Sequence, residues 1–277
     1  MRTGALKYAA YEEATSQTAW EKNNIMIITQ EREKTMATKT NSSEVVVEMK
    51  PLEIVQTTLH VEGITPLIMH AWSDKAIQQM LDAQMGKAKG KEKEKKNPME
   101  DFIRSAYWLT PMPAEYTEEA FQEAIANGAR FGFPVTAFKQ AAISAAYRLG
   151  WVRDKMGLRG AFFINADANT VYGSALANPN DVSSSYVVEK PMDMVEIHSD
   201  APIMREDMVR IGMGTADIRY RAEFRNWSAD LKISYNKSGQ FSLDSIVNII
   251  NAGGYVCGVG EWRPERDGSN GQFMVKL

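Results

Sequence analysis

A helix with a defined start and a defined end constrains the fold of this chain more than any other segment. Within FGFPVTAFKQAAISAAYRLG, four apolar residues recur at helical spacing: Phe138, Ala142, Ile143 and Ala146. Proline is accepted in the first turn of a helix, and glycine commonly follows the last turn. The sequence therefore predicts a helix that begins at Pro134 and is stopped by Gly150.

Alternating polar and apolar residues predict strands on both sides of this helix. EIVQTTLHVEG places His60 and Val61 on opposite faces of a half-buried strand. DIRYRAEF and WSADLKISY alternate in the same way and are separated by Arg225 and Asn226, so they predict a strand pair. QFMVKL predicts a strand at the end of the sequence.

Three further helices complete the predicted order of elements. Ser73 and Asp74 can cap a helix through AIQQMLDAQM, PMEDFIRSAYWL begins a helix at a permitted proline, and LDSIVNIINAGG ends one at glycine. Helices between strands, with strands first and last, favour a split βαβ sheet over an all-parallel doubly wound sheet. The expected fold class is therefore α+β, with a ferredoxin-like or RRM core that carries insertions.

The first fifty residues differ in composition from the rest of the chain. Residues 1–50 are polar, and Met36, followed by ATKTNSSE, is a plausible internal start. We expect residues 1–50 to form a disordered or dispensable extension and residues 51–277 to form one domain. The 44% hydrophobic content of the 277 residues is enough for a sizeable core. A lysine-rich insertion is expected near 86–97.

Composition disfavours several classes of protein. No window approaches eighteen consecutive apolar residues, and the N-terminus lacks a signal peptide's apolar core, so we expect a cytoplasmic protein without a membrane partner. Cys257 is the single cysteine, and the three histidines lack zinc-binding spacing. The sequence thus predicts neither a metal site nor a cofactor.

Positive charge is concentrated locally, although the formal net charge is −3. Between Arg130 and Gly160, six cationic residues stand against Asp154 alone, which gives a local charge of +5. GKAKGKEKEKK, from Gly86 to Lys96, has six lysines and two glutamates, a local charge of +4. A solvated, mobile insertion explains this lysine tract, whereas a basic arm that touches a polyanion is the functional interpretation.

Four stretches occur in a fixed order: GITPLIMH after the first strand, FPVTAFKQAAISAAYRL, MREDMVRIGMGTADIRYRAEF and the glycine-rich GGYVCGVGEWRPERDGSNGQF. Together, over roughly residues 53–277, they resemble the RAMP superfamily, the RRM-fold proteins that form CRISPR effector backbones. In that family a TPL-like turn, a Pro-small-x-x-Lys helix, a hairpin after an Arg-containing segment and a glycine-rich loop follow one another. The charged EWRPERDG and the lysine tract depart from this pattern. The chain also resembles uncharacterised phage and prophage proteins.

The resemblance implies a non-catalytic protein that binds RNA or single-stranded DNA, in several copies along the strand, as a homo-oligomer or within a multi-subunit assembly. A second function class is a metal-dependent RNA-cleaving subunit, since some RAMP proteins use an aspartate after the first strand, where Asp74 lies. The sequence context of Asp74 favours a helix cap, and no second carboxylate accompanies it at metal spacing. A phage interaction protein that keeps the fold without binding nucleic acid is the third class. His70 is interpreted as structural rather than catalytic.

The candidate nucleic-acid-binding residues come from three segments. Lys139 lies in the second turn of the predicted helix, where amide dipoles also favour an anion; an exposed helix lysine is the alternative. In the glycine-rich end, bare backbone can approach a sugar–phosphate chain, arginines add charge and a tryptophan adds a stacking face; a turn-rich hairpin is the alternative. The residues concerned are Gly258, Gly260, Trp262, Arg263, Arg266, Gly268 and Gly271.

Segment 205–225 interleaves arginines with aromatic residues, the mixture that backbone tracking and base stacking require. The candidates in this segment are Arg205, Arg210 and Arg221. Acidic neighbours, among them Asp207 and Glu223, nearly balance the charge, so surface ion pairs are the alternative interpretation.

Overall fold

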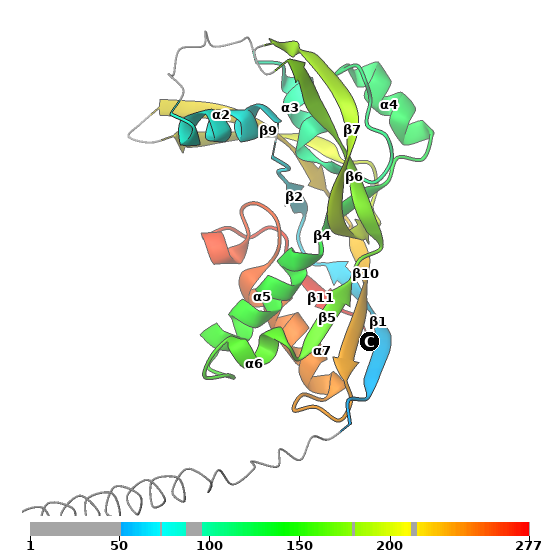
Figure 1. Cartoon of the computed structure of the whole chain (residues 1–277), viewed down its shortest axis with the longest axis vertical. Helices are drawn as coiled ribbons and strands as arrows, with labels where there is room; N and C mark the ends of the chain where they lie inside the picture. The colour runs from blue at the N-terminus through cyan, green and yellow to red at the C-terminus, as the bar shows by residue number, and fades with distance from the viewer. Residues whose placement is uncertain (1–50, 73, 87–95, 179–180, 212–214, 277) are drawn as a thin grey trace, which may run out of the picture. The chain divides into compact units, whose positions relative to one another are not determined.

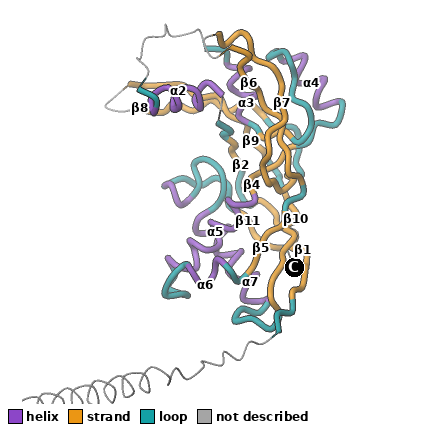
Figure 2. Tube along the Cα trace, in the orientation of Figure 1, coloured by secondary structure: helices purple, strands orange, loops and turns teal. Residues whose placement is uncertain are grey.

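The computed structural model of the chain describes residues 51–277 except 73, 87–95, 179–180, 212–214 and 277. Figure 1 shows the described chain, and Figure 2 shows its helices and strands. The extension expected over 1–50 and most of the lysine-rich insertion expected near 86–97 lie outside the described residues, as does Ser73.

The described chain combines helices with strands. The helices are α2 (Asp74–Gln84), α3 (Pro98–Ser105), α4 (Glu118–Ala126), α5 (Val135–Arg148), α6 (Met156–Arg159) and α7 (Leu243–Ala252), with a π-helical turn η1 (Gly253–Cys257) and a 3-10 turn η2 (Pro264–Arg266). The strands are β1 (Ile54–Gly63), β2 (Leu67–Met69), β3 (Tyr107–Trp108), β4 (Phe131–Pro134), β5 (Phe162–Asn165), β6 (Ala168–Asn178), β7 (Asp181–Ile197), β8 (Ile203–Ile211), β9 (Thr215–Phe224), β10 (Ser228–Asn236) and β11 (Phe273–Val275). In the described chain, six strands, β5 to β10, follow one another between α6 and α7.

A four-stranded antiparallel sheet in the order β11-β1-β10-β5 forms one half of the fold. Its central strands pair with Leu59 opposite Leu231. The helices α5 and α7 lie on one face of this sheet (Figure 1). In chain order, the strands and these two helices are β1, α5, β5, β10, α7 and β11. That βαββαβ order is the order of a split βαβ sheet. The predicted α+β class is therefore confirmed.

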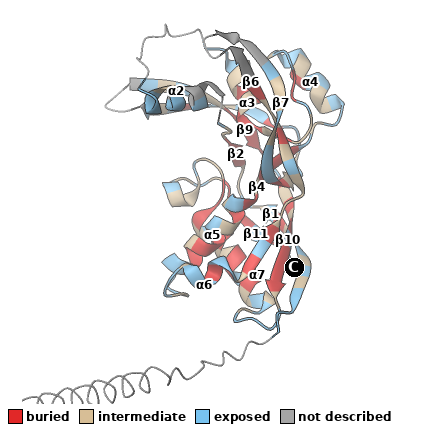
Figure 3. Ribbon diagram, in the orientation of Figure 1, coloured by how far each residue is buried: buried red, intermediate tan, exposed pale blue. Residues whose placement is uncertain are grey.

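Burial follows the predicted alternation in this sheet. Val61 and Leu231 are fully buried, whereas at the neighbouring positions His60 is half-buried and Lys232 is exposed. Figure 3 shows the burial along the strands of this sheet. The helix predicted after Pro134 is α5, and Gly150 follows it with a left-handed φ of 72°. The first strand, the last strand and the four predicted helices are all present. The helix predicted over PMEDFIRSAYWL is shorter than that segment, because α3 ends at Ser105 and Tyr107–Trp108 form β3.

An aromatic cluster holds α5 against the sheet. The ring centroid of Phe138 lies 5.4 Å from that of Phe273, which lies 6.0 Å from that of Trp227. The indole N–H of Trp227 donates to the carbonyl oxygen of Thr65 over 2.8 Å. Because each ring is almost completely buried, the cluster fixes the position of α5 on the sheet.

Two insertions build the other half of the fold. Residues 64–134 lie between β1 and α5, and residues 166–227 lie between β5 and β10. Strands of one insertion pair with strands of the other: β2 with β9, β3 with β6 and β4 with β7. The second insertion also forms the hairpins β6–β7 and β8–β9. The sequence predicts an insertion only at the lysine tract, so most of this half is unforeseen.

The predicted pairing of DIRYRAEF with WSADLKISY is wrong. The first segment lies in β9, which pairs with β8 and β2, and the second lies in β10, which pairs with β1 and β5. Asn226, between them, has a left-handed φ of 51°, and Trp227 is anchored on Thr65. The chain therefore passes from one sheet to another at this turn. Alternation identifies a strand but does not select its partner.

None of the helices in the described ranges is long and apolar enough to cross a membrane.

Candidate nucleic-acid interface

Cations and exposed rings gather on the outer side of α5 and α6. We call this surface the α5–α6 face, and it consists of Lys139, Tyr147, Arg148, Arg153, Lys155, Arg159 and Phe163. The local charge predicted from the sequence also includes Arg130. That side chain bonds Glu196 on β7 instead, in the other half of the fold. Five of the six predicted cations thus belong to the α5–α6 face.

Contacts between cations and rings connect the members of the α5–α6 face. The ammonium of Lys139 lies 4.1 Å from the ring centroid of Phe163 and donates to the carbonyl oxygen of Arg159 over 2.8 Å. Lys155 lies 5.3 Å from the ring centroid of Tyr147. Burial lowers the pKa of Lys139 below its ordinary value of 10.5. The face therefore presents ammonium groups beside aromatic surface.

Few carboxylates neutralise this face. Within the described part of the chain, Arg153, Lys155 and Arg159 form no ion pair, whereas Arg148 bonds Glu265 over 2.8 Å. The nearby carboxylate of Asp154 accepts a hydrogen bond from the backbone N–H of Met156 over 2.7 Å and so serves as the cap of α6. The field at the face is consequently positive, although the whole chain is slightly acidic.

A cavity of about 280 Å³ opens at the first turn of α5. Side chains from α5, from the segment after β2, from β3 and from the glycine-rich loop line it, among them His70, Trp72, Tyr107, Gln140, Glu261 and Arg263. Burial, with a smaller contribution from Arg221, lowers the pKa of His70 below its ordinary value of 6.5. The imidazole is therefore neutral at pH 7.

The glycine-rich loop that forms one wall of the cavity packs against protein backbone. Gly260 has φ of 82°, and a Cβ there would lie 2.6 Å from the carbonyl oxygen of Ile68. Gly271 has φ of 68°, and a Cβ there would lie 1.7 Å from the carbonyl oxygen of Val259. The conformation and close approach of this loop thus account for its glycines at these positions. Contact between the loop and a nucleic acid stays a prediction.

The arginines of the β8–β9 hairpin lie in a network of ion pairs. Arg221, only 2% exposed, and Arg205 each bond Asp207 over 2.9 Å. Arg205 also bonds Glu223 over 2.9 Å, and Arg225 bonds Glu223 over 2.8 Å. Burial alone would raise the pKa of Asp207, but the hydrogen bonds from the arginines outweigh it and lower that pKa. The ion pairs that offered the alternative interpretation of segment 205–225 are therefore present.

The predicted binding residues lie in several separate parts of the structure. Lys139 lies on the α5–α6 face, and Gly258, Gly260 and Arg263 line the cavity. Gly268 and Gly271 pack inside the glycine-rich loop, whereas Arg205 and Arg221 lie in the ion-pair network of the hairpin. Arg210 and Arg266 are exposed. Trp262 has a left-handed φ of 51° and is 37% exposed.

Some residues of these surfaces are absent from the sequence-based candidates. A helical wheel of the predicted helix places three of them, Thr136, Gln140 and Tyr147, on one face of α5. Phe163 lies 54% exposed in β5, a strand that the sequence does not predict. His70, interpreted as structural from the sequence, lines the cavity.

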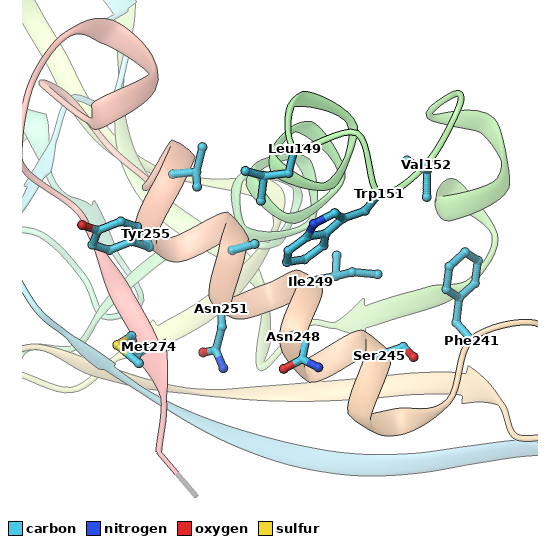
Figure 4. A pocket seen from close by; sticks show the side chains of 12 residues that line it. Leu149, Trp151, Val152, Phe241, Ser245, Asn248, Ile249, Asn251, Tyr255 and Met274 are labelled. Carbon is cyan, nitrogen blue, oxygen red and sulfur yellow. The ribbon is translucent and has the colours of Figure 1, made fainter.

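An apolar groove of about 780 Å³ lies at the other end of α5. Figure 4 shows Trp151 beside Leu149 and above Ile249 of α7, with Tyr255 and Met274 further along the groove. Trp151 and Tyr255 are 55% and 65% exposed. The groove therefore offers aromatic and aliphatic surface, in contrast to the polar cavity at the first turn of α5.

No family model matches the sequence, and no curated protein matches it. Among solved structures, the crystal structure of Cmr6 from Pyrococcus furiosus is similar over 82% of this chain and 100% of its own chain. The two sequences are 10% identical in this alignment, and the TM-score is 0.27.

Proposed function

We propose that this chain binds single-stranded nucleic acid, RNA or DNA, along the α5–α6 face, as a non-enzymatic RAMP-type protein. The observation that carries the proposal is that four cations of this face, Lys139, Arg153, Lys155 and Arg159, form no ion pair in the described residues and that exposed rings lie on the same face. Lys139 lies over the ring of Phe163, and Lys155 lies over the ring of Tyr147.

This combination suits a single strand for two physical reasons. Cations that neutralise phosphates release bound counterions, which makes the affinity strong at low salt and independent of base sequence. Exposed rings such as Tyr147, 48% exposed, offer a surface on which any base can stack. A duplex hides the faces of its bases, so the rings favour a single strand.

Binding of a fluorescently labelled oligonucleotide, measured by anisotropy at low and moderate salt, tests the proposal. In the triple variant Arg153→Ala, Lys155→Ala, Arg159→Ala, the slope of log affinity against log salt should fall by about 2, since each phosphate contact on a single strand contributes about 0.7. The triple variant Lys232→Ala, Lys237→Ala, Lys276→Ala removes the same charge from exposed positions elsewhere and should keep the parent's slope. Equal losses in both variants would contradict the assignment of the face.

Several parts of the proposal need separate experiments. Assembly in multiple copies along a strand predicts stepwise complexes on longer oligonucleotides in a gel shift. The absence of any binding by the parent protein would favour the third class, a phage-type interaction protein that keeps the fold.

The enzymatic alternative centres on Asp74, the first residue of α2. No group of three His, Cys, Asp or Glu side chains placed to hold a metal ion is found in the described residues. Incubation of the protein with single-stranded RNA and a divalent metal should give no cleavage. Cleavage that Asp74→Asn abolishes would replace the proposal with a nuclease.

A further inference from the structure

We infer that the cavity at the first turn of α5 holds one nucleobase, turned out of the strand that lies on the α5–α6 face. This inference rests on the proposed function and adds a separate site to it. Gln140, which lines the cavity, is the direct neighbour in α5 of Lys139, which belongs to the face. A strand on the face is thus within reach of the cavity.

The size and walls of the cavity suit a flat ring. Its volume of about 280 Å³ equals that of about nine liquid water molecules, which is too small for a folded peptide segment. The rings of Trp72, Tyr107 and Phe133 line it, and the centroids of Tyr107 and Phe133 lie 5.9 Å apart in an edge-to-face arrangement. Trp72, 61% exposed, offers an indole face to an entering base.

Some polar groups of the cavity have no hydrogen-bond partner in the described residues. The Nδ1 atom of His70 is buried without a hydrogen bond. Among the described residues, none of the side chains of Tyr107, Thr136 and Gln140 forms a hydrogen bond either. Buried polar atoms are normally satisfied, so an unpaired group beside other free donors and acceptors indicates a ligand with several polar atoms. The edge of a nucleobase offers such a set.

The charges around the cavity favour a base over a phosphate. Glu265 is bonded by Arg148 over 2.8 Å and by Arg263 over 3.2 Å, whereas Glu261, within the described ranges, forms only a 3.8 Å ion pair with Arg221. The carboxylate of Glu261 can therefore accept from the N–H groups of a base but repels a phosphate. Arg263 is held by Glu265 over 3.2 Å and by the carbonyl oxygen of Gly260 over 2.9 Å. Its charge is therefore already compensated. The phosphates stay on the face, and the base enters the cavity.

An abasic oligonucleotide separates the two contributions, because it keeps every phosphate and lacks every base. Anisotropy gives the affinities of a short labelled deoxyoligonucleotide and of its abasic counterpart for the parent protein and for variants. Trp72→Ala should weaken binding of the natural oligonucleotide by about fivefold or more, the loss expected for one stacked base, and Gln140→Ala by about twofold to tenfold, the loss expected for one hydrogen bond. Both variants should leave the affinity for the abasic oligonucleotide unchanged. Tyr186→Ala, which removes a ring of similar exposure from the β6–β7 hairpin, should change neither affinity.

The outcomes distinguish the two proposals. If the parent binds neither oligonucleotide, the proposed function fails. If the parent binds and both variants, shown by thermal melting to be folded, retain the parent's affinity for the natural oligonucleotide, the base site is wrong while the function stands. If the variants lose affinity equally for the natural and abasic oligonucleotides, the cavity contacts the phosphate chain and the base site is again wrong. Gln140 is exposed, so its variant keeps the test valid should Trp72→Ala fail to fold.

Discussion

The β8–β9 hairpin and the α5–α6 face are both rich in cations, but their cations have different partners. On the hairpin, Arg205 and Arg221 bond carboxylates over 2.9 Å. On the face, Lys155 lies over a ring, and the guanidinium of Arg159 lies 3.5 Å from the sulfur of Met156. A count of charges in the sequence treats the two regions alike, whereas the positions of the carboxylates neutralise the cations of the hairpin and leave most cations of the face without an ion pair in the described residues.

Strand register explains why the hairpin neutralises itself. Arg205 stands directly opposite Arg221, a like-charged pair that would destabilise the hairpin. Asp207 and Glu223 occupy the diagonal positions, and each accepts hydrogen bonds from an arginine of the other strand. On α5 and α6 the nearby Asp154 is used as a cap instead. The comparison predicts that removal of hairpin cations affects stability and removal of face cations affects binding.

The largest effect is expected for Arg221→Ala. This variant leaves Asp207 buried without one of its partners, and removal of one partner from a buried ion pair costs about 3–5 kcal/mol of unfolding free energy. Urea denaturation measures the loss. Arg210→Ala, on the same hairpin but exposed, should change the unfolding free energy by less than about 0.5 kcal/mol. A stable Arg221→Ala protein with weakened oligonucleotide binding would move the interface to the hairpin.

Asp207→Asn should lower the unfolding free energy by about 1.5–3 kcal/mol near pH 7, because hydrogen bonds to a charged group are lost. The pKa of Asp207 in the folded protein lies below the ordinary value of 3.8, so the unfolded chain takes up the proton first as the pH falls. The difference between parent and variant should therefore be constant above about pH 5 and shrink below the ordinary pKa. Urea titrations at stepwise lower pH measure it. A difference that grows on acidification would contradict the network.

Local signals in the sequence identify the split βαβ half apart from β5, but in the other half they identify only α2, α3 and the strand segment of β9. The spacing of Phe138 to Ala146, with Pro134 and Gly150 at the ends, is sufficient for α5 because a helix is determined by near neighbours. The pairings of β2 with β9 and of β4 with β7 join residues far apart in the chain, and no local pattern encodes such partners.

The candidate site was predictable to a similar extent. Lys139 and the local charge around it follow from the sequence, as does the glycine-rich loop. The pairing of Arg221 with Asp207 depends on strand register, and the use of glycine at Gly271 depends on where Val259 lies. Neither feature can be predicted from the sequence, because each depends on which residues become neighbours in the tertiary structure.

Tyr147→Ala should weaken single-strand binding by roughly 1–3 kcal/mol, the range found for loss of one stacked base. Because the ring is 48% exposed, the unfolding free energy should stay close to the parent's. Anisotropy and urea denaturation measure the two quantities on the same preparation. The matched control is Met208→Ala on the hairpin, whose side chain is 77% exposed and which should leave binding unchanged. Equal effects of the two variants would remove the distinction between the two regions.

Arg153→Ala should have the smallest effect on stability and still report on binding. Its side chain is exposed and forms no ion pair within the described ranges, so the unfolding free energy should change by less than about 0.5 kcal/mol. If Arg153 contacts one phosphate, the slope of log affinity against log salt should fall by about 0.7, whereas Arg225→Ala, which removes an exposed arginine paired with Glu223, should leave the slope unchanged. Since both substitutions remove one positive charge, a general effect of net charge would lower both slopes alike. A slope that falls only for Arg225→Ala would mean that the ion-paired arginines exchange their carboxylates for phosphates, and the hairpin rather than the α5–α6 face would then be the surface that follows the strand.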